Sequence, residues 1–348
     1  MTNKIKYIEL LRFIATIAVI LIHVSATIPN NYSIVEVGIF NYASMYTSYV
    51  AVNWAVPIFL MITGALLLRD ERNLNLQKIK TYITRMLLVL LTFGIFFSMI
   101  EICMNEKEIS FSILLTAVIN TASGKSWSHI WYIYLLIGIY IVTLPIKYAV
   151  NIMREKHELD LFIIILCIGN FVIPFFNTIF QLNIENFMQF SHYLTYFILG
   201  YRLSLITREN IYNFKLSNFA LFVFLFISIL KCVLSFNWIY MYKEICPFIQ
   251  GGGKIFTLIQ ASSLFIFIKL FSDKINSKLT IINRINMCSF CIYIIHPVFI
   301  NILYKIFKIT PLIIQVNFGI FLMFIVVFLL SWISSEILIQ LPVLRKIL

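Results

Sequence analysis

The sequence predicts an all-α protein, a polytopic membrane helix bundle of about ten transmembrane helices. Of the 348 residues, 61% are hydrophobic and only 12% are charged, whereas a soluble globular domain carries about 25% charged residues. The mean hydropathy of +0.93 places nearly the whole chain in or beside a lipid bilayer. The net charge of +12 does not indicate a nucleic-acid partner, because basic residues collect on the cytoplasmic side of membrane proteins.

Runs of roughly 20 apolar residues mark the expected spans. They cover residues 5–27, 44–68, 82–102, 130–150, 160–180, 190–206, 217–236, 254–271, 289–307 and 312–337. Segment 111–121 is too short to span and is expected to be re-entrant or interfacial. The first run is too long for a signal peptide and lacks a small-residue cleavage site, so it is interpreted as a permanent span.

Basic residues divide unevenly between the two sides of such a bundle. With the N-terminus placed in the cytoplasm, 19 Lys and Arg residues fall inside and 7, including Lys231, fall outside. This bias predicts that both termini are cytoplasmic. No linker, charge block or low-complexity tail divides the chain, so residues 1–348 are expected to form one domain with no appended extracellular domain.

The first span carries an arginine and a histidine on one face. Arg12 and His23 are 11 residues apart, which is roughly 20° past three helical turns and about 16 Å along the axis. Ionisable residues inside a membrane helix are costly and are therefore candidates for function. The alternative is that Arg12 extends to the cytoplasmic interface and His23 is a satisfied polar core residue. Glu9 lies one turn before Arg12, and pairing would lower the cost of burying both.

The histidines and arginines separate by depth in this topology. Four of the five histidines lie at mid-depth or nearer the outside, His23, His129 and His296 among them, whereas Arg12 and Arg85 lie near the cytoplasmic ends of their helices. This arrangement suits a phosphate-bearing donor bound from the cytoplasm and a reaction nearer the outer face. Interfacial histidines and positive-inside charges alone would give the same pattern.

Two short patterns resemble known sites only superficially. Cys288 and Cys291 form a C-x-x-C, but their apolar surroundings favour small core residues over a redox or zinc pair, and no metal is expected. Residues 251–254 lack the G-x-x-x-x-G-K-S/T spacing and a preceding strand, so they do not predict a phosphate loop.

Pro57 is expected to break the second span, where Gly64 allows close approach of another helix.

Four motifs follow one another along the chain. They are Glu9-Leu10-Leu11-Arg12 with His23 eleven residues after the arginine, VPIFLMITG at 56–64, HIWYIY at 129–134 and CIYIIH at 291–296. Together they resemble the signature segments of the acyltransferase 3 family of integral membrane acyltransferases. Within it, the chain is most similar to the stand-alone O-acetyltransferases of bacterial surface polysaccharides. One departure is Tyr82, three residues before Arg85, where the family often carries a second arginine; Lys80 is the candidate substitute.

The resemblance implies an acyl-CoA donor, by default acetyl-CoA, and a glycan or lipid-linked saccharide acceptor at a bacterial plasma membrane, among its lipids. A thioester is already activated, so the chemistry mainly needs a base for an acceptor hydroxyl, and His23 is predicted to be that base. Glu9 and His296 are further catalytic candidates. The expected donor-binding residues are Arg12, Arg85 and Lys80, and the expected acceptor-binding residues are His129, Trp131 and Tyr132.

The rival hypothesis is a non-enzyme, either a lipid-linked glycan flippase or a small-solute transporter. It shares the buried charges and the ten spans, but no internal repeat supports it. The membrane-bound O-acyltransferases also use a buried histidine, yet their asparagine–histidine pairing pattern does not occur here. The sequence leaves open the acceptor, the acyl group, the oligomeric state, and whether transfer is direct or passes through an acyl-His23 intermediate.

Overall fold

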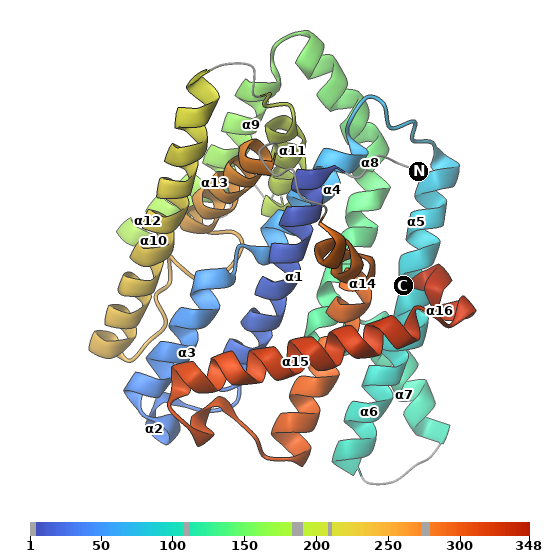
Figure 1. Ribbon diagram of the computed structural model, residues 1–348, viewed down its shortest axis with the longest axis vertical. Coiled ribbons are helices and arrows are strands. Elements are labelled where there is room, and N and C mark those ends of the chain that lie inside the picture. Colours follow the sequence, from blue (N-terminus) through green and yellow to red (C-terminus); the bar gives the residue numbers. More distant parts are fainter. Residues whose placement is uncertain (1–4, 107–110, 183–190, 208–210, 273–278) are drawn as a thin grey trace.

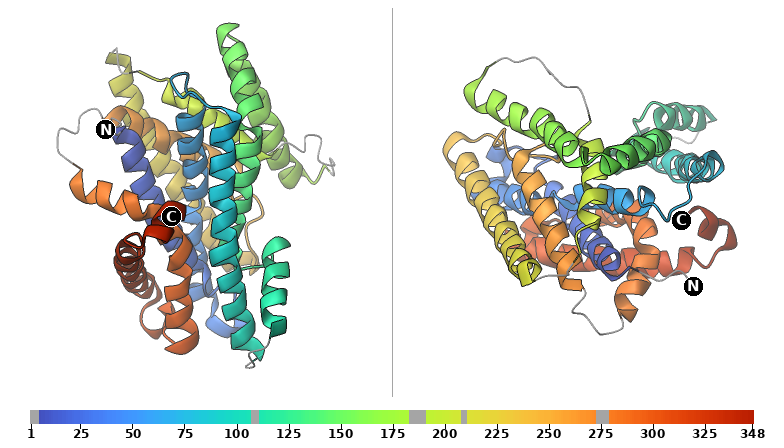
Figure 2. Two further views of the ribbon diagram at one scale, coloured as in Figure 1. Left: turned by 90° about the vertical axis from the view of Figure 1, so that its right-hand side faces the viewer. Right: turned by 90° about the horizontal axis from the view of Figure 1, so that it is seen from above.

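The computed structural model describes residues 5–106, 111–182, 191–207, 211–272 and 279–348. Within those ranges the regular structure is helical and no strand occurs, which confirms the predicted fold class. Most helices run along one long axis and form a bundle (Figures 1 and 2). The helices are α1 (Lys6–Ala26), α2 (Ile34–Val37), α3 (Ile39–Val52), α4 (Ala55–Leu67), α5 (Leu76–Val89), α6 (Ile95–Glu106), α7 (Phe111–Ala122), α8 (Trp131–Glu155), α9 (Leu159–Cys167), α10 (Ile173–Phe180), α11 (His192–Ser204), α12 (Ile211–Tyr242), α13 (Ile255–Phe271), α14 (Thr280–Asn301), α15 (Val316–Leu338) and α16 (Pro342–Ile347).

Eight helical segments of the described chain are long and apolar enough to cross a membrane. They are Lys6–Ala26, Ile39–Leu67, Leu76–Cys103, Ser128–Glu155, Leu159–Phe180, Lys215–Tyr242, Thr280–Ile306 and Val316–Leu338. The other two expected spans, 190–206 and 254–271, form the shorter helices α11 and α13, of 13 and 17 residues. Segment 111–121 forms the short helix α7, which contains too few residues to span.

The first helix lies at the centre of the bundle. It packs against α3, α4, α13, α14 and α15, which surround it (Figure 1). By contrast, α15 runs across the long axis of the bundle over α1, α3 and α14, and α16 then contacts α5. The polar residues of α1 therefore face other helices, which lowers the cost of placing them at membrane depth.

The predicted break in the second span lies between α3 and α4. Asn53 and Trp54 form a turn there, and Pro57 follows in the first turn of α4. An uninterrupted helix would need an N–H at Pro57 to donate to the Asn53 carbonyl, and proline has none. The break leaves Asn53 at a helix end inside the bundle, where it is only 6% exposed.

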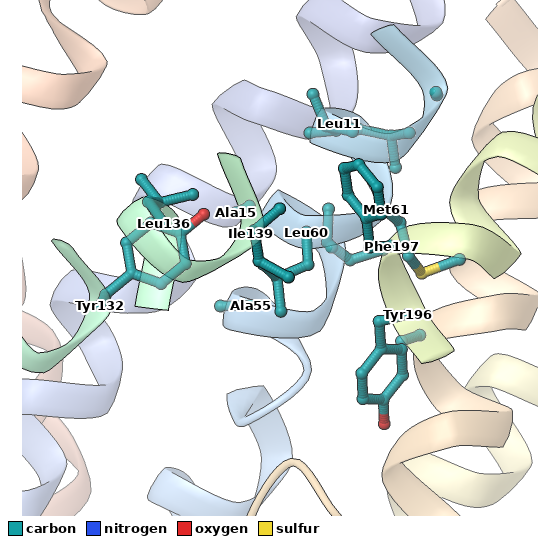
Figure 3. Close-up of a cluster of buried hydrophobic side chains, with 14 of the residues drawn as sticks. Leu11, Ala15, Ala55, Leu60, Met61, Tyr132, Leu136, Ile139, Tyr196 and Phe197 are labelled. Carbon is teal, nitrogen blue, oxygen red and sulfur yellow. The ribbon is translucent and has the colours of Figure 1, made fainter. Parts of the chain in front are cut away.

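Two glycines bring α4 and α11 into direct backbone contact. A Cβ atom added to Gly64 would overlap the backbone of Phe197, and one added to Gly200 would overlap the backbone of Met61. Small residues permit this approach between helices in a membrane, as expected for Gly64. Figure 3 shows the surrounding core, in which Met61 and Phe197 belong to one cluster with side chains from α1 and α8.

Lys231, counted above among the outer charges, is not a loop residue. The helix expected over 217–236 extends to Tyr242, so Lys231 lies in its interior and is 0% exposed. Counting charges by their order along the chain cannot distinguish a loop lysine from one whose helix buries it against neighbours.

Candidate active site

Three histidines from distant parts of the chain form one cluster. His23 lies on α1, His129 lies in a 3-10 turn (Ser128–Ile130) before α8, and His296 lies on α14. The ring centroid of His23 is 4.9 Å from that of His296 and 6.3 Å from that of His129. The His129 and His296 centroids are 5.9 Å apart. The structure thus brings together three residues that the sequence analysis selected separately.

Backbone carbonyls orient two of these rings. His129 Nε2 lies 3.1 Å from the Ile294 carbonyl oxygen, and His296 Nδ1 lies 3.1 Å from that of Ile292. A nitrogen facing a carbonyl must carry the proton, so the other nitrogen of each neutral ring has a free lone pair. His296 Nε2 is buried and has no hydrogen-bond partner in the described chain.

His23 differs from both neighbours in its access to space. Its ring makes no hydrogen bond within the described residues and is partly exposed, whereas His129 and His296 are 2% and 0% exposed. His23 and His129 both border a cavity of about 320 Å³, which we call the histidine cavity. A ring nitrogen without a protein partner, beside an open space, is able to accept a proton from a bound molecule.

The walls of the histidine cavity are neutral. Its polar and aromatic lining residues are Asn30, Tyr46, Tyr49, Asn53, Ser128, Trp131, Tyr132, Tyr193, Gln250 and Tyr293. Trp131, which is 41% exposed, lies with its ring centroid 5.4 Å from that of Tyr193. No Asp, Glu, Lys or Arg of the described residues lines this cavity.

A second opening, the side cavity, also reaches His23 and His129. It has a volume of about 380 Å³ and lies between α6, α7 and α14. Glu101 lies in its wall, where Lys305 Nζ is 3.2 Å from Glu101 Oε1 and Trp127 Nε1 donates to Oε2 over 3.0 Å. This ion pair links α6 to the π-helical turn that follows α14.

A third space, the arginine cavity, has a volume of about 490 Å³ and is lined by Arg12, Arg72 and Arg85. Arg85 Nε donates to the Ile347 carbonyl oxygen over 2.9 Å, and Arg85 Nη2 donates to that of Leu348. Guanidinium groups bind phosphate oxygens with paired N–H donors. The arrangement can therefore hold a polyphosphate.

Arg72 was not among the donor-binding residues predicted from the sequence. It lies close to Tyr82, which stands where the resemblance suggested a second arginine. Its Nη2 donates to the Tyr82 hydroxyl over 2.6 Å, so a guanidinium reaches the position where the resemblance led us to expect a second arginine. Lys80, the proposed substitute, is exposed and does not line the arginine cavity. The only sequence signal for Arg72 was the group of basic residues between the second and third spans.

Glu9 lies at the arginine end of α1 and not among the histidines. Its carboxylate accepts a hydrogen bond from Asn286 Nδ2 over 2.7 Å and lies 3.6 Å from Arg12 Nη1. Asn286 also donates to the Glu9 carbonyl oxygen over 2.8 Å. These contacts hold Arg12 at the edge of the arginine cavity, as expected from the i to i+3 spacing.

Two tyrosines separate the arginine cavity from the histidine cavity. Tyr132 and Tyr293 line both spaces, and their ring centroids are 5.6 Å apart. The Tyr293 hydroxyl donates to the His129 carbonyl oxygen, which fixes this wall to the histidine cluster. The two rings are in edge-to-face contact and form a closed wall, so a molecule that extends from the arginines to His23 has to displace one of them.

Comparison with known proteins gives one family. A family model described as an acyltransferase domain, of the acyltransferase 3 type, matches residues 5–336. No curated protein and no solved structure matches the chain. The matched range contains the three histidines and the three arginines described above.

Proposed function

Since the chain belongs to the acyltransferase 3 family, we propose that this multi-pass membrane acyltransferase acetylates a bacterial cell-envelope glycan from acetyl-CoA. The donor would bind in the arginine cavity and the glycan hydroxyl in the histidine cavity. The main support is that α1 contributes to both spaces, with Arg12 at one and His23 at the other. The arginine cavity and the histidine cavity lie toward opposite ends of α1. The donor and the acceptor would therefore enter from opposite faces of the plasma membrane.

Coenzyme A suits the arginine cavity by charge. Its phosphates are multiply anionic, and Arg12, Arg72 and Arg85 present guanidinium donors to one space. The carbonyl oxygens of Ile347 and Leu348 occupy Arg85 donors in this structure, and phosphate oxygens can accept the same hydrogen bonds. We therefore assign to Arg72 the role that the sequence suggested for Lys80.

In the proposed step, His23 accepts the proton of the acceptor hydroxyl while the oxygen attacks the thioester carbonyl carbon. The C–S bond then breaks, the acyl group remains on the acceptor oxygen, and the coenzyme A thiolate takes the proton back from the imidazolium. A histidine base contributes about 10²- to 10⁴-fold to such a reaction. The free lone pair of His296 Nε2 can accept an N–H from His23 and so orient its other nitrogen toward the acceptor.

An acyl-His23 intermediate would use the same residues. In that case the imidazole attacks the thioester first, and coenzyme A leaves before the acceptor reacts. A burst of coenzyme A release without acceptor would identify this route, because covalent catalysis separates the two half-reactions. Release that always requires acceptor would identify direct attack.

Mass spectrometry of surface glycans tests the proposal. We expect the glycans of bacterial cells that lack the protein, or carry His23→Ala, to be lighter by one acetyl group per modified sugar. Cells carrying His157→Ala serve as the control, since His157 is exposed and lines none of the three cavities. Unchanged acetylation in cells without the protein, together with a lipid-linked saccharide retained on the cytoplasmic face, would favour the flippase hypothesis instead.

A further inference from the structure

A lysine is buried inside the bundle without an acidic partner. Lys231 of α12 is 0% exposed, and its Nζ donates to Asn53 Oδ1 over 2.6 Å, to Gln260 Oε1 over 2.7 Å and to Thr257 Oγ1 over 3.2 Å. An ammonium group has three N–H donors and no acceptor, so these three oxygens match its capacity. Within the described chain Lys231 forms no ion pair. Such a residue in a membrane helix is costly and is a candidate for function.

The ammonium group fixes the orientation of one amide at the break between α3 and α4. Asn53 Oδ1 faces Lys231 and also accepts from Thr257 Oγ1 over 3.2 Å. Turning the amide over would place its NH₂ group against the ammonium, which would leave donor facing donor. Asn53 Nδ2 is therefore held on the side of the amide away from Lys231.

That amide nitrogen is buried and unused. Asn53 is 6% exposed and lines the histidine cavity, and its Nδ2 has no hydrogen-bond partner in the described chain. The hydroxyl of Tyr46, which lines the same cavity, is likewise buried without a partner. Buried polar groups are almost always hydrogen-bonded, so two unpaired groups in one cavity wall indicate a polar molecule that binds there.

We infer that Asn53 binds the acceptor by donating from Nδ2 to one of its oxygens, and that Lys231 is a positioning residue that holds the Asn53 amide. The inference rests on the proposed function, because it places the acceptor in the histidine cavity. A neutral polyol fits this role, since the lining residues are uncharged and include the Trp131 and Tyr193 rings. The acceptor hydroxyl would then lie between Asn53 and His23.

An isosteric variant separates binding from structure. Asn53→Asp keeps an oxygen for Lys231 and removes the Nδ2 donor. Gln260→Glu is the matched control, because it places the same carboxylate beside the same ammonium and also removes an amide N–H donor, here to Ala51 O and Ser228 Oγ, while none of these residues lines the histidine cavity. Lys231→Met provides a variant without the buried charge, in which Asn53 Oδ1 and Gln260 Oε1 lose their ammonium donor.

The measurement is steady-state acetyl transfer by the full chain in detergent, from acetyl-CoA to p-nitrophenyl glycosides of glucose, galactose and N-acetylglucosamine. We expect Asn53→Asp to raise the acceptor KM about 10-fold, as loss of one buried hydrogen bond predicts, with the acetyl-CoA KM unchanged. Lys231→Met should raise the acceptor KM less, because the amide remains but can turn. Gln260→Glu should keep the wild-type acceptor KM.

An unchanged acceptor KM in Asn53→Asp, with active wild-type protein, would overturn the inference and leave the proposed function intact. An equal rise in Gln260→Glu would also overturn it, since the network would then be structural only. If the wild-type protein acetylates none of the glycosides, a simple hexose glycoside is rejected as the acceptor, and the role of Asn53 toward it is rejected as well.

Discussion

The arginine cavity and the histidine cavity differ in charge although they share a wall. Arg12, Arg72 and Arg85 line the former, whereas the latter has no charged lining residue in the described part of the chain. A polyanionic donor needs fixed guanidinium donors, whereas a neutral polyol needs amides, hydroxyls and aromatic faces. The difference in lining is what the proposed function requires of a donor site at one end of α1 and an acceptor site at the other.

The shared wall explains how two unlike cavities can serve one reaction. Tyr132 and Tyr293 border both spaces, and Tyr293 is hydrogen-bonded to the backbone of His129. In the proposed reaction, the donor's phosphates would stay at the arginines and its thioester would reach His23 after displacing a tyrosine ring. Binding energy at one end would then position the reacting atoms at the other.

The largest effect is expected for substitutions of His23, which should slow the chemical step without weakening donor binding. His23→Ala should lower acetyl transfer by at least about 10²-fold, because the reaction loses its base. Coenzyme A affinity, measured by calorimetry in detergent, should stay near the wild-type value. Loss of coenzyme A binding in this variant would show that His23 belongs to the donor site, and near-normal turnover in His23→Gln would show that it is structural.

A smaller effect is expected at the opposite end of α1. Arg12→Ala should weaken coenzyme A binding about 10-fold, the scale of one charge-assisted hydrogen bond. Arg12→Lys should also weaken binding, because a point charge does not reproduce the guanidinium fork. Calorimetry provides the measurement, with Arg85→Ala in parallel. Wild-type affinity in both alanine variants would reject the arginine cavity as the donor site.

The smallest effect tests which residue takes the place of the second arginine expected near Arg85. Arg72→Ala should weaken coenzyme A binding about 3-fold, because Arg72 is exposed and water screens its charge. Lys80→Ala should leave the affinity unchanged, since Lys80 lies outside the cavity. The reverse order of effects would restore Lys80 as the donor-binding residue.

The sequence by itself determined the helical class, most helix positions and the alignment of Arg12 with His23. These properties are local, because hydropathy fixes which runs enter the bilayer and the helical repeat fixes which residues share a face. His129 and His296 could be selected by motif, and the family match is consistent with those motifs. The break at Asn53 also followed from a local cause, the missing N–H of Pro57.

Only the tertiary structure decided which distant residues meet. The ring centroids of His296 and His23 are 4.9 Å apart, and Arg72 donates a hydrogen bond to Tyr82. Lys231 donates to Asn53, which precedes it by 178 residues. The tertiary structure also separated Lys80 from the arginine cavity and buried Lys231 against neighbouring helices. Periodicity within a helix determines which side chains share a face. Which neighbour a side chain contacts depends on how the helices pack, and helix packing is set by side-chain shapes along the whole chain.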